Sequence, residues 1–531
     1  MLSRVYTGAV IGVDGLIMEV EVDIAIGLPA FTTVGLPEAS VRESRERVKA
    51  AILNCGYEFP DDRITVNLAP AHIRKAGTGF DLPIALGILA ASGVLPGSDA
   101  ARYVILGELA LDGRVKPFFG TLSMALAAKA AGFEGILVPA ENAPEAAVVD
   151  NLSVYPVHTV SDAVSFLRNE KDLLPEDCSA AAAFTEEDAS DADFSEVSGQ
   201  MHAKRAMEIA AAGKHNLLMT GPPGSGKTML ARRFPGIIPP MRFDEAMETT
   251  KVYSVAGMLP ENRALVTRRP FRAPHHTISH AGLVGGGSNP RPGEVSLAHN
   301  GVLFLDELPE FKKSVLEVLR QPLEDRAVTI SRASMSITYP AAFTLIAAMN
   351  PCPCGYLSDP KRECLCSPTQ IQKYTSRVSG PLVDRIDLHV EVPNVEYGDI
   401  ADGKPAEASA AIRERVVKAA RIQEKRFSRL AISSNAGMGS RHIRKYCAVG
   451  DDSAQILRRA MEQLGFSARA YHRVLKIART IADLAGETAI GPDHVLEAIQ
   501  YRSLDRNASG VDRVYEAVAP YGAERVCQLL K

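Results

Sequence analysis

The stretch LLMTGPPGSGKTML, residues 217–230, decides the fold of this chain. It joins an apolar strand, the spacing GxxxxGKT and an apolar segment that can start a helix. In such a loop the backbone amides wrap the phosphates of a nucleotide, and glycine leaves room for their approach. The pattern predicts a nucleotide site at Gly221, Pro222, Pro223, Gly224, Ser225, Gly226, Lys227 and Thr228. Lys227 would reach the β- and γ-phosphates, and Thr228 would bind Mg²⁺.

Length and composition are those of a globular protein. The 531 residues leave room for roughly two to four domains. Lys plus Arg number 59 against 63 for Asp plus Glu, a net charge of −4, so any contact with a polyanion must be local. The first residues lack the features of an export signal, and no stretch reaches the length of a membrane span. We therefore expect a cytoplasmic protein with no membrane partner.

Strand and helix patterns divide the chain into four segments. Residues 1–168 alternate between the two patterns, which predicts an α/β domain; one example is the strand MEVEVDIAI at residues 18–26. Residues 169–193 are dense in acid and alanine and predict a solvated linker. Residues 194–402 form a second α/β segment that contains the phosphate loop, and residues 403–531 are almost wholly helical in pattern.

Two further strands end in polar residues that suit phosphoryl transfer. In GVLFLDELPEF an apolar run is followed by Asp306 and Glu307. In FTLIAAMNPCPCG an apolar run is followed by Asn350. Open α/β sheets bind ligands at this edge. Asp306 would hold Mg²⁺ through coordinated waters and Glu307 would polarise the attacking water, while Asn350 would orient that water or sense the γ-phosphate. The alternatives are an ordinary strand end and an Asn-Pro turn.

The order of these motifs resembles that of AAA+ ATPases in the branch of magnesium chelatase and the replicative helicase MCM. The resemblance rests on the phosphate loop, LFLDE, AAMN, SGPLVDRIDLHVEV and SARAYHRVLKIART. RPFRAPHHTISHAGLVGGG, GEVSLAHNGVLFLDELPEF and NPCPCG are similar, more closely, to the ComM (YifB) family of magnesium-chelatase-like ATPases over nearly the full length. The resemblance implies an AAA+ parallel-sheet core, a C-terminal helical lid, ATP and Mg²⁺ as cofactors, and a homohexameric ring.

The same resemblance assigns roles to residues that the motifs alone leave open. It implies sensor 1 at Asn350, an arginine finger for a neighbouring subunit at Arg385, and sensor 2 on the lid at Arg469. A guanidinium supplied in trans would neutralise transition-state charge, so hydrolysis would require the assembled ring. Without the resemblance, surface ion pairs are the alternative for both arginines. The adenine pocket would involve Val197, Gly199 and Gln200.

The first domain is similar to the α/β domain of Lon protease, on the stretch GELALDGRVKPFFGTL. It departs from Lon at the catalytic positions. Gly79 stands where the nucleophilic serine is expected, and no lysine near Leu122 replaces the base. Because a serine nucleophile needs its base, we expect a non-proteolytic ring or partner-binding module.

Four of the eight cysteines lie in two close pairs, C-P-C and C-L-C. The four residues, in an insert at 352–366, are Cys352, Cys354, Cys364 and Cys366. Four soft ligands in two pairs suit tetrahedral Zn²⁺, and the alternatives are a redox-active set or unligated cysteines. The isolated cysteines are expected to be inert: Cys55, Cys178, Cys447 and Cys527.

Two segments could line the channel of a ring. RRPFRAPHHTISHAGLVGGGSNPRPGE carries four arginines around a Gly-rich tip: Arg268, Arg269, Arg272 and Arg291. VTISRASMSITYP predicts a hairpin with Arg332 near its turn. Such arginines could follow a sugar-phosphate backbone, and solvated turns are the alternative. For His275, His276 and His280 the pattern favours structural or substrate-adjacent roles over metal binding.

Two functions follow from these motifs. The first is a DNA motor, a helicase-like ATPase that acts on single-stranded or branched DNA, as similarity to ComM in natural transformation implies. The second is a remodelling ATPase that acts on a protein partner, as magnesium chelatase does. The Lon-like domain and the cysteine quartet argue against a true chelatase subunit, and intact Glu307 and Arg385 argue against a scaffold without turnover. We expect the DNA motor and keep the remodelling ATPase as the alternative.

Overall fold

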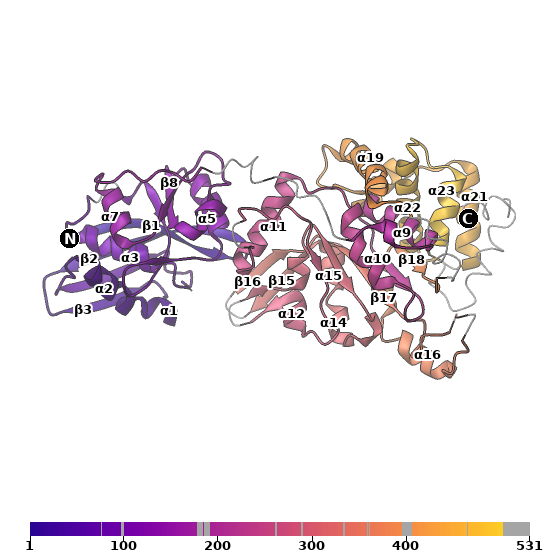
Figure 1. Cartoon of the computed structure of the whole chain (residues 1–531), viewed down its shortest axis with the longest axis horizontal. Helices are drawn as coiled ribbons and strands as arrows, with labels where there is room; N and C mark the ends of the chain where they lie inside the picture. Colours follow the sequence, from indigo (N-terminus) through magenta and orange to yellow (C-terminus); the bar gives the residue numbers. More distant parts are fainter. Residues whose placement is uncertain are drawn as a thin grey trace.

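The computed structural model shows three bodies in a row along the molecule (Figure 1). It describes residues 1–75, 77–96, 100–177, 184, 192–260, 263–287, 290–332, 335–357, 359, 362–395, 406–464 and 466–502. Most of the predicted linker, the predicted boundary at 402/403, Cys178 and Cys527 lie outside these residues. No helix within the described ranges is long and apolar enough to cross a membrane.

The first body is built on a seven-stranded mixed sheet in the order β3-β4-β2-β1-β5-β8-β9. Its long strands β1 (Leu2–Ile11) and β2 (Asp14–Ala25) pair antiparallel. The predicted alternation in β2 is confirmed, because Met18, Val20 and Val22 are buried. The remaining strands are β3 (Ala30–Val34), β4 (Arg63–Ala69), β5 (Tyr103–Ile105), β8 (Gly135–Pro139) and β9 (Ser153–Val157).

Helices cover this sheet. Every residue of α3 (Asp81–Ala91) is buried, because it packs on β1 and β2 and is covered by α2 (Ser44–Asn54) and α7 (Val160–Leu167). Helix α5 (Thr121–Ala130) packs on β2 and β8. This layering confirms the predicted α/β domain.

The second body is a five-stranded sheet in the order β11-β14-β17-β10-β18, in which all neighbouring strands are parallel. The strands are β10 (Leu217–Thr220), β11 (Phe271–Arg272), β14 (Val302–Leu305), β17 (Thr344–Met349) and β18 (Leu388–Glu391). In a parallel sheet all carboxyl ends meet at one edge. The loops that follow β10, β14 and β17 therefore lie together, as the sequence predicts.

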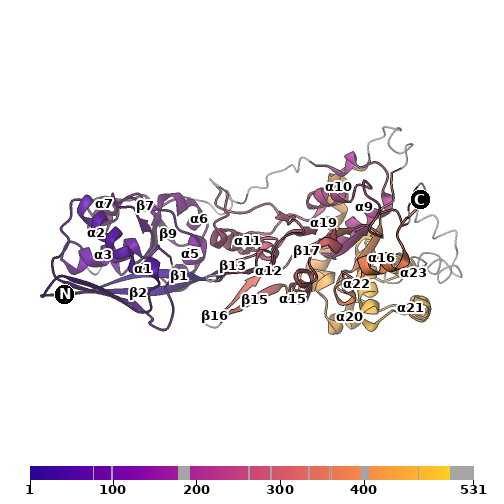
Figure 2. The same cartoon turned by 90° about the horizontal axis from the view of Figure 1, so that it is seen from below.

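A hairpin and a short helical segment project from the core on the side of the first body (Figure 2). The hairpin is β15 (Ala327–Arg332) with β16 (Met335–Pro340), and the predicted hairpin with Arg332 near its turn is confirmed. The segment contains α12 (His280–Val284), β12 (Gly285–Gly286) and β13 (Arg291–Pro292). Val13, at the β1–β2 turn, packs against the same hydrophobic cluster as Ile337 of the hairpin.

The first body also contacts α11 (Phe243–Ala256) of the core. Ser254 of α11 donates a hydrogen bond to the Glu145 carboxylate, which also accepts one from the Leu122 amide. Burial raises the pKa of Glu145 above its ordinary value. The two bodies therefore share a buried polar contact as well as apolar packing.

The third body is helical, as predicted. Its helices are α19 (Ser409–Phe427), α20 (Ser440–Tyr446), α21 (Asp451–Leu464), α22 (Ala468–Ala485) and α23 (Pro492–Gln500). Leu217 and Val302 of the sheet belong to one hydrophobic cluster with Val474 and Ile477 of α22. The helical body thus shares its core with the sheet, and the predicted order of an α/β domain, a parallel-sheet core and a C-terminal helical domain is confirmed.

Candidate functional site

The phosphate loop connects β10, an inner strand of the sheet, to helix α10 (Lys227–Arg233). Gly224 and Gly226 have φ angles of +81° and +90°, in the region that side chains disfavour. The loop therefore turns tightly and leads into the amino end of α10, where backbone amides can bind phosphate.

Lys227 is held inside this loop. Its ammonium donates hydrogen bonds of 2.8 Å to the carbonyl oxygens of Gly221 and Pro222, and lies 3.3 Å from Asn350 Oδ1. Burial lowers the pKa of Lys227, and the nearby Asp306 raises it. The structure thus brings together the phosphate-loop lysine and the predicted sensor asparagine, which is 123 residues further along the chain.

Thr228 and Asp306 meet directly at the same edge. The Thr228 hydroxyl donates a hydrogen bond of 2.6 Å to Asp306 Oδ2. A hydroxyl and a carboxylate are hard oxygen groups of the kind that Mg²⁺ prefers, and Asp306 would hold the ion through its coordinated waters. The two predicted magnesium ligands fit that ion.

Glu307 follows Asp306 with a φ of +52°, which is uncommon for a residue with a side chain. Its carboxylate is 57% exposed and lies 3.3 Å from Nδ1 of His276. Strained backbone of this kind clusters at functional sites. His276 is thus adjacent to the proposed water-polarising group, a contact that the sequence did not reveal.

Of the predicted adenine-pocket residues, Gln200 contacts the phosphate loop. Gln200 Nε2 donates hydrogen bonds to the carbonyl oxygens of Pro393, at 2.5 Å, and Ser225, at 3.4 Å. Val197 is buried, and its carbonyl accepts a hydrogen bond from Lys204. Gln200 thus contacts the loop, and Gly199 is its neighbour in the chain.

Arg385 lies at the opposite edge of the sheet from the phosphate loop. It precedes the amino end of β18, whereas the loop follows the carboxyl end of the neighbouring strand β10. Its guanidinium donates to the Pro381 carbonyl at 2.6 Å and pairs with Glu324 at 2.7 Å. Arg385 is therefore not placed to reach a nucleotide bound by its own chain.

Arg469 is exposed in the first turn of α22. Arg473, about 6 Å further along the helix axis, donates to the Arg385 carbonyl at 3.1 Å and pairs with Asp387. The structure therefore places Arg469 on the side of the sheet that carries Arg385. It does not bring either arginine to Lys227 of the same chain.

The four predicted cysteine ligands form a compact cluster. Their sulfur atoms all lie within 4.8 Å of one another, and the separations from Cys352 Sγ to Cys354 Sγ and Cys364 Sγ are 3.3 and 3.6 Å. A tetrahedron with Zn–S bonds of about 2.3 Å has edges of about 3.8 Å. The quartet, which also includes Cys366, fits Zn²⁺. Among the residues that the structure describes, no other group of three or more His, Cys, Asp or Glu side chains has this spacing.

The cysteine insert touches the phosphate loop. Cys352 is fully buried two residues after Asn350. A Cβ at Gly355 would lie 2.4 Å from Cδ of Pro223, so the two loops are in direct contact there. The cysteine cluster is therefore adjacent to the nucleotide site.

The arginines of the predicted channel segments differ in environment. The Arg269 side chain is 7% exposed and pairs with Glu245 at 2.8 Å, and Arg272 pairs with Glu294 at 2.6 Å. Both guanidinium groups are engaged by carboxylates of the same chain, so the other arginines of these segments are the better candidates for contact with a substrate. Arg268, Arg291 and Arg332 are exposed.

The two channel segments lie side by side. Gly286 of β12 pairs with Arg291 of β13, and a Cβ at Gly286 would lie 3.5 Å from Nη2 of Arg332. Tyr339 of the hairpin also donates a 2.7 Å hydrogen bond to the Pro290 carbonyl. Two exposed guanidinium side chains therefore flank one glycine.

Comparison with known proteins places the chain in a family. The family models described as "Magnesium chelatase, subunit ChlI", "Subunit ChlI of Mg-chelatase" and "Magnesium chelatase, subunit ChlI C-terminal" match residues 193–400, 20–142 and 406–502. "Competence protein ComM" of Haemophilus influenzae is 45% identical over 507 residues, which are 95% of this chain and 98% of that protein. The chain belongs to the ComM (YifB) family of magnesium-chelatase-like AAA+ ATPases.

One other relative supports this assignment, and a shorter match supports the resemblance to Lon protease. "Uncharacterized protein YifB" of Salmonella typhimurium is 43% identical over 95% of this chain and 98% of that protein. "Lon protease 2" of Bacillus subtilis is 31% identical over 157 residues, 27% of each chain. The resemblances to this family and to Lon protease are therefore confirmed, and membership in an AAA+ family favours ATP and Mg²⁺ as cofactors.

Proposed function

We propose that this chain hydrolyses ATP in a homohexameric ring and uses the energy to move DNA. The observation that supports hydrolysis most directly is a pair of hydrogen bonds at one edge of the sheet, between Thr228 and Asp306 and between Lys227 and Asn350. Lys227 and the loop amides would bind the phosphates, and Glu307 would polarise the attacking water. Mg²⁺, held by Thr228 and Asp306, would neutralise charge on the β- and γ-phosphates.

The placement of the two remaining arginines supports the proposed ring. Arg385 and Arg469 lie away from the nucleotide site of their own chain, at the edge that carries the amino end of β18. Guanidinium groups at that position can act on the nucleotide of a neighbouring subunit. A single chain would then lack part of the machinery, so turnover would require assembly.

DNA is the substrate that the exposed loops favour. Arg291 and Arg332 flank Gly286, and both are free to approach a phosphate backbone. The similarity to a protein named for competence supports a role in natural transformation or recombination, with branch migration or helicase activity as the work done. A cytoplasmic location stays a prediction from the sequence.

Replacing Arg291 and Arg332 together with alanine is expected to weaken DNA binding and flatten its salt dependence. Each phosphate contact that is lost reduces by about 0.9 the magnitude of the slope of the logarithm of the binding constant against the logarithm of the salt concentration. Fluorescence anisotropy with duplex and single-stranded DNA at several salt concentrations measures this slope. Arg421→Ala, at an exposed position of α19, is the control and should match the wild type. An unchanged slope in the double variant would contradict the proposed DNA contact.

We also propose that the cysteine quartet holds one Zn²⁺ per chain. Its sulfur separations match a tetrahedral thiolate site, and the insert packs against Pro223 of the phosphate loop. Structural zinc of this kind contributes directly to folding free energy.

Protein purified without added metal is therefore expected to contain about one zinc per chain by elemental analysis, and a Cys352→Ser/Cys364→Ser variant should contain none. Cys55→Ser is the matched control, because Cys55 lies outside the quartet. A folded wild-type protein that hydrolyses ATP without any metal at the quartet would contradict the proposed zinc site.

The first domain is proposed to be a non-proteolytic module. A Cβ at Gly79 would lie 2.7 Å from Cδ2 of Phe118, so a serine does not fit there without movement of that ring. Leu122 is fully buried. The domain instead packs against the hairpin that carries Arg332, which suits a role in supporting the substrate loops or in binding a partner.

A further inference from the structure

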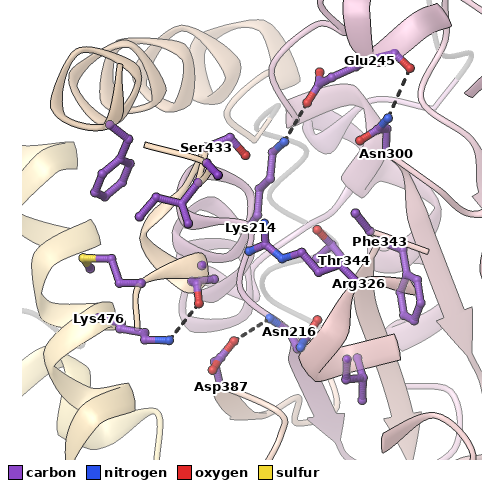
Figure 3. Close-up of a pocket in the computed structure, with 18 of the residues that line it drawn as sticks. Lys214, Asn216, Glu245, Asn300, Arg326, Phe343, Thr344, Asp387, Ser433 and Lys476 are labelled. Atoms are coloured by element: carbon purple, nitrogen blue, oxygen red, sulfur yellow. Dashed lines mark hydrogen bonds and ion pairs between the residues drawn. The ribbon is translucent and has the colours of Figure 1, made fainter. Parts of the chain in front are cut away.

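A cavity of about 1010 Å³ lies between the ATPase core and the helical domain. It is at the edge of the sheet opposite to the phosphate loop, because its wall includes Lys214 and Asn216, which precede β10, and Asp387, which precedes β18. The helical domain contributes Lys476 of α22. In Figure 3 the Arg326 side chain points into the middle of this cavity, between Lys214 and Lys476.

Each acidic side chain of the cavity wall already has a basic partner. Glu245 pairs with both Lys214 and Arg269, at 2.9 and 2.8 Å. The remaining pairs are Asp244 with Arg242, Glu248 with His299, Glu324 with Arg385, Asp387 with Arg473, and Glu424 with Arg242. The acids of the wall are therefore engaged.

Arg326 and Lys476 lack such a partner. The Arg326 guanidinium makes no hydrogen bond or ion pair with any residue in the described ranges, and the Lys476 ammonium donates only to the Ala436 carbonyl. Burial lowers the pKa of Lys476; the charge of Asp387 raises it, and the charges of Arg473 and Arg326 lower it. Burial likewise lowers the pKa of Lys214; its partner Glu245 raises it, and Arg269 and Arg326 lower it. Asp387 is the acidic group that acts on both Arg326 and Lys476, and it is already paired with Arg473. Buried cations that share one engaged carboxylate are stabilised when an anion joins them.

Arg385 gives a second indication of a ligand in the same wall. Its side chain is only 8% exposed, and its Nε is buried without a hydrogen-bond partner. Unsatisfied buried donors of this kind are rare in proteins. Arg385 and Arg326 thus both present unused hydrogen-bonding capacity at one cavity.

We propose that this cavity is an anion-binding site for a polyphosphate group, with Arg326 and Lys476 as its charged contacts. Arginine and lysine from separate elements suit phosphate groups that carry several charges. The volume is that of a nucleotide-sized ligand site. Because Arg326 belongs to the core and Lys476 to the helical domain, a bound polyphosphate bridges the two bodies and fixes their relative position. The site is independent of the substrate on which the ring acts.

The polyphosphate is either free in solution or presented by the nucleotide of a neighbouring subunit, and two experiments separate these sources. The first uses the full chain with Lys227→Ala, which disables the phosphate loop, and titrates it with inorganic triphosphate by calorimetry. A free ligand predicts saturable binding that Arg326→Gln, and separately Lys476→Gln, weakens at least tenfold. Arg421→Gln is the control and should have no effect. Thermal melting of each variant checks that it is folded. Binding that both variants leave unchanged overturns the proposal.

The second experiment applies when the Lys227→Ala chain binds no free triphosphate. Arg385→Ala subunits are mixed with Glu307→Gln subunits, so that active interfaces form only between the two kinds of chain. Adding Arg326→Gln to the Glu307→Gln chain is expected to abolish the recovered ATPase activity, whereas adding Arg421→Gln should not. Recovery that survives Arg326→Gln overturns the proposal. If mixing Arg385→Ala and Glu307→Gln subunits recovers no ATPase activity, the proposed action of Arg385 in trans is contradicted. The idea that a neighbouring subunit's nucleotide supplies the polyphosphate is then contradicted as well.

Discussion

Lys227→Ala is expected to lower ATP affinity by about 100-fold or more, and Glu307→Gln is expected to bind ATP normally and lose turnover. Lys227 is buried among the carbonyls of the loop and next to Asn350, where its charge would meet the phosphates. Each hydrogen bond to a charged group is worth about 1.5–3 kcal/mol. Removing the ammonium therefore removes ground-state binding.

Glu307 has a different role. Its carboxylate is more than half exposed and contacts His276, so its loss should leave the binding loop intact. Loss of a general base typically costs about 10²- to 10⁴-fold in rate. Binding of a fluorescent nucleotide and release of phosphate separate the two effects. Glu310→Gln is a matched control three residues away, since Glu310 pairs with Arg377 on the surface. Equal turnover in Glu307→Gln and wild-type protein would contradict this role.

Arg385→Ala is expected to leave ATP affinity nearly intact and to reduce turnover by about 10³- to 10⁵-fold, the range measured for arginine fingers. The reason is positional. Arg385 lies at the edge of the sheet opposite to its own phosphate loop, so it can stabilise transition-state charge only in a neighbouring subunit. Arg320→Ala serves as the control, because Arg320 pairs with Glu317 near the surface.

Mixing subunits tests the action in trans. Arg385→Ala chains have an intact nucleotide site, and Glu307→Gln chains have an intact finger. Interfaces between the two kinds of chain should therefore recover part of the activity that each variant lacks alone. If no mixing ratio recovers activity, while both variants still assemble, the finger does not act in this way.

The grouping of Lys227, Thr228, Asp306 and Asn350 in the candidate nucleotide site could be predicted from the sequence because its signals are local. An apolar strand followed by a glycine loop, by Asp306 and Glu307, or by Asn350 marks the carboxyl end of a parallel strand. Because neighbouring strands are parallel, their carboxyl ends lie at the same edge of the sheet. These residues can therefore be grouped without knowing how distant segments pack. The cysteine cluster was predictable for the same reason, since its two close pairs lie within one short insert.

The remaining contacts depend on packing between distant segments. His276 meets Glu307 only because β11 and β14 pair in the sheet. Arg269 and Arg272 resemble the exposed Arg268 in the sequence, but the folding of α11 and α13 (Glu294–Leu297) supplies Glu245 and Glu294 as their partners. The side of the sheet on which Arg469 lies follows from where α22 packs. Such pairings leave no periodic trace in the sequence.

The central claim is that ATP hydrolysis in the ring is coupled to DNA. The most direct test is the ATPase rate of the assembled wild-type protein with single-stranded, duplex and four-way-junction DNA at two salt concentrations. The account predicts that DNA stimulates hydrolysis at low salt and that the stimulation falls at high salt, because backbone contacts release counterions. A confirmed hexamer whose rate none of the three DNAs changes at low salt would contradict the account and favour a remodelling ATPase that acts on a protein partner.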